Sequence, residues 1–397
     1  MSSLSVVSLL TGFLTAMVVI TEISDDGDPP KKPQEEPKEN RSLLLTIPND
    51  VIDICVAMVP RCHYPTVTSV SRYFRTLMAS SIPYVLRSFR NITESVLYAF
   101  IGFHLVEIPR WYILHRIPYR NQVISLRLCK IDSLPPSMPF GSAVVSVGHE
   151  MYVIGGCDRK REQILSVFLI DCRNHTLHEL RSMNRARCRA AAGIINGKIY
   201  VIGGCEKSYP DWVEVYDLKT EAWSPVLGPY PYGTQKGEIE SYVVMKEKIY
   251  LLDRDSCFSY EPRTGNWESY DNDRLRLFWL TSSCVVDDRL YTLAPLGLQG
   301  SSVIVYDPEE KDWVGVKGVH CLPKLFYHDY KMANFGGKLV ILGVSERYTD
   351  GARDILCVEI GLERRQGGEI WGNVESVKCV LTSLSLPTID LCRTVTV

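Results

Sequence analysis

Few residues of this chain have the types and spacing that catalysis or metal binding requires. Cys172, His175 and His178 have ligand-like spacing, and thiolate and imidazole groups are common zinc ligands. A closed tetrahedral site needs a fourth ligand, and none is evident in the sequence. We interpret this segment as a solvated turn whose side chains do not converge, and we expect no metal and no cofactor.

Other signs of catalysis are weaker still. No Ser or Cys lies in a nucleophile context such as G-x-S-x-G. The doublets Gly155-Gly156 and Gly203-Gly204 are not expected to bind phosphate, because no helix follows them. Arg185, Arg187 and Arg189 could form a basic rim that grips an acidic peptide, although arginines in such a loop are more often solvated. We therefore predict a protein that is not an enzyme.

The composition is that of a globular protein with nearly balanced charge. Apolar residues make up 46% of the 397 residues, and the formal net charge is −2. This balance lacks the basic excess expected of a nucleic-acid-binding protein, so we expect no such partner. The 13 cysteines include no C-x-x-C pair, and we interpret them as reduced thiols of a cytoplasmic or nuclear protein.

The N-terminal region has two segments of different composition. Residues 1–23 are apolar from Leu4 to Ile20, but they lack the basic residues that open a signal peptide. A span of roughly seventeen residues is also the short limit for a membrane helix. We expect a leader without a membrane role, with anchoring by residues 4–20 as the alternative. Residues 24–41 are rich in proline and charge, which predicts a disordered linker.

Residues 42–90 have the pattern of short helices. The sequence Ile47-Pro48-Asn49-Asp50 places proline and acid at a helix start. Apolar residues at helical spacing predict a second helix over about 65–79, and Pro83–Arg90 a third. About fifty residues bury little apolar surface, so we expect these helices to need a partner that covers them.

From Thr93 onward the helical pattern gives way to repeated strands. The phrase Asn196–Gly204 joins a two-residue turn signal, a β-branched strand and a glycine doublet. Copies recur at intervals of roughly 40 to 50 residues. In three copies a Trp follows a Tyr by seven residues, whereas in the first copy Asp171 and Leu177 stand in the matching slots and the Trp is lost. The three pairs are Tyr216 and Trp223, Tyr260 and Trp267, and Tyr306 and Trp313.

A unit of this length with about four short strands is typical of a kelch-type propeller blade. We interpret the Tyr and Trp residues as packing between adjacent blades. The glycine doublets Gly155-Gly156 and Gly203-Gly204 are interpreted as positions where the sheet crowds toward the propeller axis. Five such units account for residues 140–373.

The two ends of the repeat region are expected to form a sixth, composite blade. Strands are predicted at 95–103 and 110–115, with Trp111 in a last-strand slot, and two C-terminal strands are predicted at 377–381 and 391–397. Closure of the ring removes the open sheet edges. The expected fold is mainly β, a six-bladed kelch-type propeller preceded by a small all-α region, with seven blades or an unclosed five as alternatives.

Two stretches of the helical region resemble the F-box of the plant F-box/kelch family. They are Leu45-Thr-Ile-Pro-Asn-Asp-Val-Ile52 and Val70-Ser-Arg-Tyr-Phe-Arg-Thr-Leu-Met-Ala-Ser80. The family usually opens with Leu-Pro-x-Asp and has Val-Ser-Lys-x-Phe-Arg-x-Leu in its second helix, so Ile47 here replaces a leucine. The resemblance implies an F-box over residues 42–90 and a kelch-repeat propeller over residues 94–397.

The same resemblance implies a role as the substrate-recognition subunit of an SCF (Skp-cullin-F-box) ubiquitin ligase. The F-box would dock the Skp adaptor, and through it a cullin, while the propeller loops would bind an unknown target protein. The residues implied for the adaptor contact, some of which also hold the core of the box, are Ile47, Pro48, Val51, Ile54, Val70, Phe74 and Leu77. One alternative is a kelch scaffold without a ligase role. Another is a copper oxidase on a kelch propeller, for which the required Tyr, His and Tyr–Cys crosslink cannot be placed.

Overall fold

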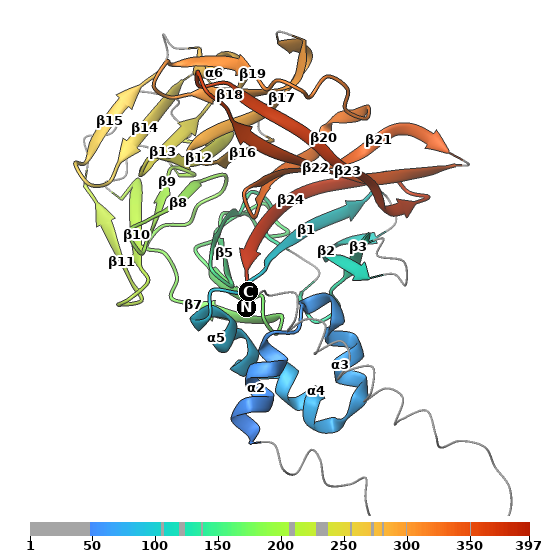
Figure 1. Cartoon of the computed structure of the whole chain (residues 1–397). Coiled ribbons are helices and arrows are strands. Elements are labelled where there is room, and N and C mark those ends of the chain that lie inside the picture. The colour runs from blue at the N-terminus through green and yellow to red at the C-terminus, as the bar shows by residue number, and fades with distance from the viewer. Residues whose placement is uncertain are drawn as a thin grey trace, which may run out of the picture. The chain divides into compact units, whose positions relative to one another are not determined.

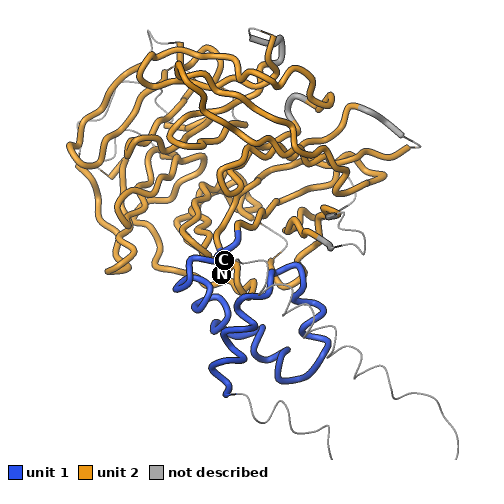
Figure 2. The backbone as a smooth tube through the Cα atoms, in the orientation of Figure 1, with its two compact units in different colours: residues 1–94, 397 blue, residues 95–396 orange. Residues whose placement is uncertain are grey.

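The structure is a computed structural model that divides into two compact units (Figure 2), residues 1–94 with Val397 and residues 95–396. It describes residues 48–104, 107–118, 124–135, 138–205, 211–227, 237–254, 256–270, 274–279, 282–298, 300–349 and 351–397. The predicted leader, the predicted linker and Ile47 lie outside these residues. Within the described ranges, no helix is long and apolar enough to cross a membrane.

The first unit consists of short helices joined by tight turns. Its elements are α2 (Asn49–Ala57), the 3₁₀ turn η1 (Arg61–His63), α3 (Tyr64–Val70), α4 (Arg72–Ala79) and α5 (Ile82–Phe89). The second helix predicted over 65–79 is in fact two helices. Ser71 is extended between them, and its hydroxyl accepts a hydrogen bond of 3.2 Å from the Phe74 amide. This serine cap starts a new helix and so ends the preceding one.

Arg87 on α5 ties this unit together. Its buried guanidinium donates hydrogen bonds to the carbonyls of Ala57 (3.1 Å) and Val59 (2.9 Å) at the C-terminal end of α2. It also forms an ion pair of 2.5 Å with Glu94. A cation is favourable beside the unpaired carbonyls that end a helix, so this side chain fixes α5 against α2.

In the part of the chain that the structure describes, the second unit is a ring of six antiparallel sheets with four strands each (Figure 1). The first blade contains β4 (Ala143–Val147), β5 (Glu150–Ile154), β6 (Val167–Asp171) and β7 (Thr176–Leu180). The second contains β8 (Ala191–Ile195), β9 (Lys198–Ile202), β10 (Val213–Asp217) and β11 (Ala222–Val226). The third contains β12 (Ser241–Met245), β13 (Lys248–Leu252), β14 (Cys257–Glu261) and β15 (Asn266–Ser269), and α6 (Leu275–Phe278) follows it.

The remaining repeats are longer and less regular. The fourth blade contains β16 (Ser283–Val286), β17 (Arg289–Leu298), β18 (Ser301–Asp307) and β19 (Asp312–Gly315). The fifth contains β20 (Leu325–Phe335), β21 (Lys338–Thr349), β22 (Ala352–Arg364) and β23 (Ile370–Ser383). The closing blade contains β1 (Ser95–Phe103), β2 (Glu107–Pro118), β3 (Ile124–Lys130) and β24 (Pro387–Thr396).

The closing blade confirms the composite sixth blade but not the predicted division of its strands. Its order is β24-β1-β2-β3, so the C-terminal end supplies one strand rather than two. Residues 377–381 lie instead in β23, which pairs with β22 from Arg364↔Ile370 to Arg353↔Ser383. This long hairpin uses the segment as the outer strand of the fifth blade. Trp111 accordingly lies on β2, the third strand of the closing blade and not the last.

β24 is the strand that closes the ring. It pairs with β1 from Ser95↔Thr396 to Phe103↔Pro387 and contacts both β20 and β4. Figure 1 shows β24 in red beside β1 in teal, the last and first strands of the propeller. Together with the first strand of each other blade, β24 lines a central channel of about 580 Å³.

The hairpin turns explain why the sequence repeats as it does. Asn196 and Gly197 have φ values of 52° and 72°, as the predicted two-residue turn requires. The third blade keeps this turn with Lys246 and Glu247, whose φ values are 46° and 57°. Neighbouring blades therefore preserve the backbone even where the residues that favour it are lost.

We expect a chain that ends at Leu386 to lose the closed ring, because β1 would then present an unpaired apolar edge. Size-exclusion chromatography and thermal unfolding should show aggregation and the loss of a single cooperative transition. The variant Leu384→Ser is the control, since this side chain is 82% exposed just before β24. A truncated chain that stays monomeric with an unchanged melting temperature would contradict this role of β24.

Candidate functional site

α5 has an unusual distribution of side chains, since it buries a charge and exposes apolar groups. Arg87 is buried, whereas Ile82, Val85 and Phe89 are 43%, 42% and 81% exposed. These three residues follow the i, i+3, i+7 spacing of one helix face, which we call the α5 face. A stripe of this kind normally packs into a core. Its exposure here indicates a surface suited to a partner.

The residues predicted for adaptor contact fall into different environments. Phe74 and Leu77 are buried in the helical unit, Ile54 and Val70 are half-buried, and Pro48 and Val51 are exposed. Phe74 and Leu77 therefore serve the core of the unit. The α5 face was missed by the sequence reasoning, although the spacing of its apolar residues was a usable signal.

The glycine doublets lie where a strand meets the linker to the next blade. The Gly156 amide donates to the Arg187 carbonyl and the Gly204 amide to the Gly237 carbonyl, each at 2.7 Å. A Cβ atom on Gly155 or Gly203 would lie 2.6 Å from those same carbonyl oxygens. Any side chain would push the linker away. The doublets thus join consecutive blades, which is a more specific role than crowding at the axis.

The Tyr and Trp residues of the repeat form tilted aromatic pairs across two strands of one blade, and each pair lies at the contact with the preceding blade. Three pairs lie directly opposite each other in register, with ring centroids 5.0, 4.6 and 5.5 Å apart. They are Tyr216 with Trp223, Tyr260 with Trp267, and Tyr306 with Trp313. In the first blade the corresponding register position pairs Ile170 with Leu177, whereas Asp171 pairs with Thr176, so the prediction that Asp171 takes the tyrosine slot is wrong by one residue. The pairs belong to the apolar clusters between neighbouring blades.

Two of the indole rings are also fixed by hydrogen bonds to a linker. The N–H of Trp223 donates to the carbonyl of Arg181 at 2.8 Å. That of Trp313 donates to the carbonyl of Arg274 at 2.9 Å. Each acceptor lies in the segment that leads into the first strand of the same blade. A repeat therefore provides both an apolar slot and a carbonyl for an indole ring.

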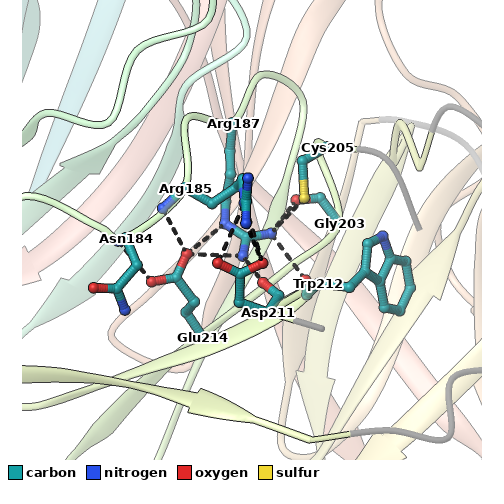
Figure 3. A network of polar contacts seen from close by, with 8 residues as sticks. All are labelled: Asn184, Arg185, Arg187, Gly203, Cys205, Asp211, Trp212 and Glu214. Carbon is teal, nitrogen blue, oxygen red and sulfur yellow. Dashed lines mark hydrogen bonds and ion pairs between the residues drawn. The ribbon is translucent and has the colours of Figure 1, made fainter. Parts of the chain in front are cut away.

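Arg187 is neither a basic rim nor a solvated loop residue, because it is buried in an ion pair with Glu214 (Figure 3). One guanidinium nitrogen donates to the carbonyls of Gly203 (2.6 Å) and Trp212 (2.8 Å). The other contacts a Glu214 oxygen at 2.9 Å. The Glu214 carboxylate also accepts a hydrogen bond of 2.8 Å from the Asn184 backbone amide. These bonds hold the linker that precedes the second blade against β10.

The neighbouring arginines lie nearer the surface. Arg185 forms an ion pair of 3.0 Å with Asp211. Arg189 reaches Glu238 at 3.5 Å and lies over the Phe140 ring. Charged partners within the propeller thus engage all three residues of the predicted basic rim.

Cys172, His175 and His178 do not converge on a common point in the way that a metal site requires. The Tyr98 hydroxyl lies 2.9 Å from the Cys172 carbonyl and 2.8 Å from the His175 ring. His178 contacts the Thr176 hydroxyl at 3.1 Å. Within the described residues, no group of three His, Cys, Asp or Glu side chains could hold a metal ion.

The central channel carries charges of both signs. Lys331 on β20 and Asp390 and Arg393 on β24 line it. Burial lowers the pKa of Lys331, an effect that the carboxylates of Asp390 and Asp329 oppose. Asp390 is exposed to the channel, yet the surrounding protein desolvates it and raises its pKa. The charges largely balance, so the channel is poorly suited to concentrate an ion of either sign.

Six four-stranded sheets, with glycine doublets in two blades and Tyr–Trp pairs in three, define a kelch-type β-propeller, here preceded by a helical unit. Residues 111–381 match the model of the FKB95 kelch-repeats domain. A putative F-box/kelch-repeat protein of Arabidopsis thaliana is 45% identical over 96% of this chain and 100% of its own length. An F-box/LRR-repeat/kelch-repeat protein of the same plant is 46% identical with the same coverage. The chain belongs to the F-box/kelch-repeat protein family, which confirms the resemblance and the predicted fold class.

We expect Arg187→Met to lower the free energy of unfolding of the propeller by about 3 to 5 kcal/mol, because it leaves the Glu214 carboxylate buried without its cation. Arg189→Met is the matched control, since this side chain is 48% exposed. It should change the free energy of unfolding by no more than about 0.5 kcal/mol. Denaturant titration measures both values. Equal effects of the two substitutions would show that the buried ion pair has no special role.

Proposed function

We propose that this chain is the substrate-recognition subunit of an SCF ubiquitin ligase. In this proposal the helical unit docks a Skp-type adaptor, and through it a cullin. The propeller holds a target protein, and other subunits transfer ubiquitin. The chain itself catalyses no step and works in the cytoplasm or the nucleus. Membership of the F-box/kelch-repeat family supports the assignment at the level of the whole chain.

The observation that carries the proposal is the exposed α5 face. Phe89 alone is 81% exposed, and burial of a phenylalanine side chain stabilises by about 1.5 to 3 kcal/mol. Val51 on α2 is a second exposed apolar group of the same unit. Apolar residues of this size are the usual anchors at the centre of an interface. The adaptor contact is therefore expected to combine Pro48 and Val51 with the α5 face.

The division between core and surface decides how the proposal can be tested. Substitution of the buried Phe74 or Leu77 would unfold the helices whatever their partner. Substitution of Val85 or Phe89 changes only the exposed face. A loss of binding in the second pair therefore reports on the interface and not on folding.

We expect Val85→Asp and Phe89→Asp each to weaken binding of a purified Skp-type adaptor at least tenfold, since both put an unpaired carboxylate into an apolar interface. Biolayer interferometry with the full chain measures the affinity. Far-UV circular dichroism should show an unchanged helical signal. Leu384→Asp makes the same chemical change at an exposed leucine of the propeller, and it should bind the adaptor like the wild type.

One outcome would count against the proposed ligase role, and two others would move the adaptor contact away from the α5 face. Failure of the wild-type chain to bind any Skp-type adaptor would leave a kelch scaffold, in which the α5 face has another partner. Unchanged affinity in both aspartate variants would show that the adaptor binds elsewhere. Adaptor binding retained by Phe89→Asp but lost in Val51→Asp would move the interface to α2.

A further inference from the structure

An apolar pocket of about 540 Å³ lies where the closing blade meets the first blade. The residues that line it include Trp111, Met138, Phe140, Phe168, Ile170 and Leu177. Trp111 is only 2% exposed, whereas Phe140 and Leu177 are 67% and 38% exposed. The pocket therefore has a buried aromatic wall and a rim that solvent reaches. Its size and apolar lining are those of a ligand site.

The pocket has a structural origin in the repeat. In the second, third and fourth blades a Tyr–Trp pair packs against the preceding blade. In the first blade Ile170 and Leu177 take the two positions. Aliphatic side chains fill less space than the two aromatic rings. The first blade thus leaves open a slot that the second, third and fourth blades fill with their own side chains.

The same repeat indicates the chemistry of the occupant. In two blades the slot accepts an indole ring and the preceding linker accepts its N–H. The linker that leads into β4 runs from Ile131 to Ser142, and its residues Pro135 and Met138 line the pocket. An aromatic side chain supplied from outside would reproduce an arrangement that this protein already makes internally.

The charge at the rim favours an acidic partner. Asp158 and Arg159 both line the pocket, and Lys160 and Arg161 follow on an exposed turn that ends at Glu162, so basic residues outnumber acidic ones by one over residues 158–162. The Asp158 carboxylate accepts hydrogen bonds from the backbone amides of Lys160 and Glu162, and these bonds fix the conformation of the turn. Basic side chains next to an apolar slot complement an aromatic residue flanked by carboxylates.

We propose that this pocket anchors an aromatic side chain, of the indole class, from an acidic segment of a partner polypeptide. The inference deepens the proposed function, because the partner would be the target protein that the propeller recognises. It places recognition at the junction of the closing and first blades rather than in the central channel. The aromatic anchor gives affinity, and the basic turn selects the acidic flanks.

The test uses the full chain and needs no adaptor, so its failure is distinct from failure of the ligase role. The probe is the peptide acetyl-Glu-Asp-Trp-Glu-Asp-amide with a fluorinated tryptophan, observed by fluorine NMR. Wild-type protein should broaden and shift its signal. Leu177→Trp, which fills the slot from within, should weaken binding at least tenfold. Leu384→Trp adds the same side chain at an exposed position away from the pocket, and it should leave binding intact.

Additional peptides and protein variants test whether the indole ring, the acidic residues and the pocket are each required for binding. A peptide with Ala in place of Trp, or with Lys in place of its acidic residues, should bind at least tenfold more weakly. Thermal unfolding checks that Leu177→Trp stays folded, and Phe140→Asp at the exposed rim provides a second loss-of-binding variant. No binding by the wild type, or equal binding by Leu177→Trp, would overturn the proposal. Free fluoroindole that binds as tightly as the peptide would also overturn it, since the site would then serve a small molecule.

Discussion

The pairing of β24 with β1 is the contact on which the propeller depends. Each blade is a small sheet with two apolar faces, so it is stable only between two neighbours. The clusters of buried residues lie between blades, including one that joins strands of the closing and fifth blades. A ring satisfies every face at once, but only if its last strand meets its first. The C-terminal strand is thus hydrogen-bonded to the first strand of the propeller, although nearly the whole propeller sequence separates the two strands.

Closure places a second demand on the linkers between blades. A linker carries backbone polar groups into the crowded interior, and these groups need partners there. The propeller meets this demand in two ways. Gly156 and Gly204 allow close backbone hydrogen bonds, and Arg187 donates hydrogen bonds to the carbonyls of Gly203 and Trp212. A buried arginine with a fixed geometry is suited to this task because its donors form a rigid planar fork.

The sequence predicted the periodic parts of the structure well. The two-residue turns, the strands and the three Tyr–Trp pairs repeat often enough for the blade and the ring to follow from local physics. The errors came where a residue's partner is distant in sequence. Nothing local distinguishes β23 from a strand of the closing blade, because both are β-branched runs, and only the pairing of β23 with β22 decides. Arg187 looked like a surface residue because Glu214, which neutralises it, lies on another strand.

The candidate surfaces were the least predictable part, and the reason is the same in both units. A surface that binds a partner departs from the usual pattern in which apolar side chains are buried and packed and charged side chains are exposed. α5 turns Ile82, Val85 and Phe89 outward and Arg87 inward, and the first blade lacks the aromatic pair that the second, third and fourth blades have. Each departure costs the isolated chain stability that a partner can restore. A repeat protein makes such departures visible, because the side chains at equivalent positions in other blades can be compared with those of the first blade. In this protein the first copy, in which the missing aromatic pair coincides with an apolar pocket, therefore carries more information about recognition than the copies that have the pair.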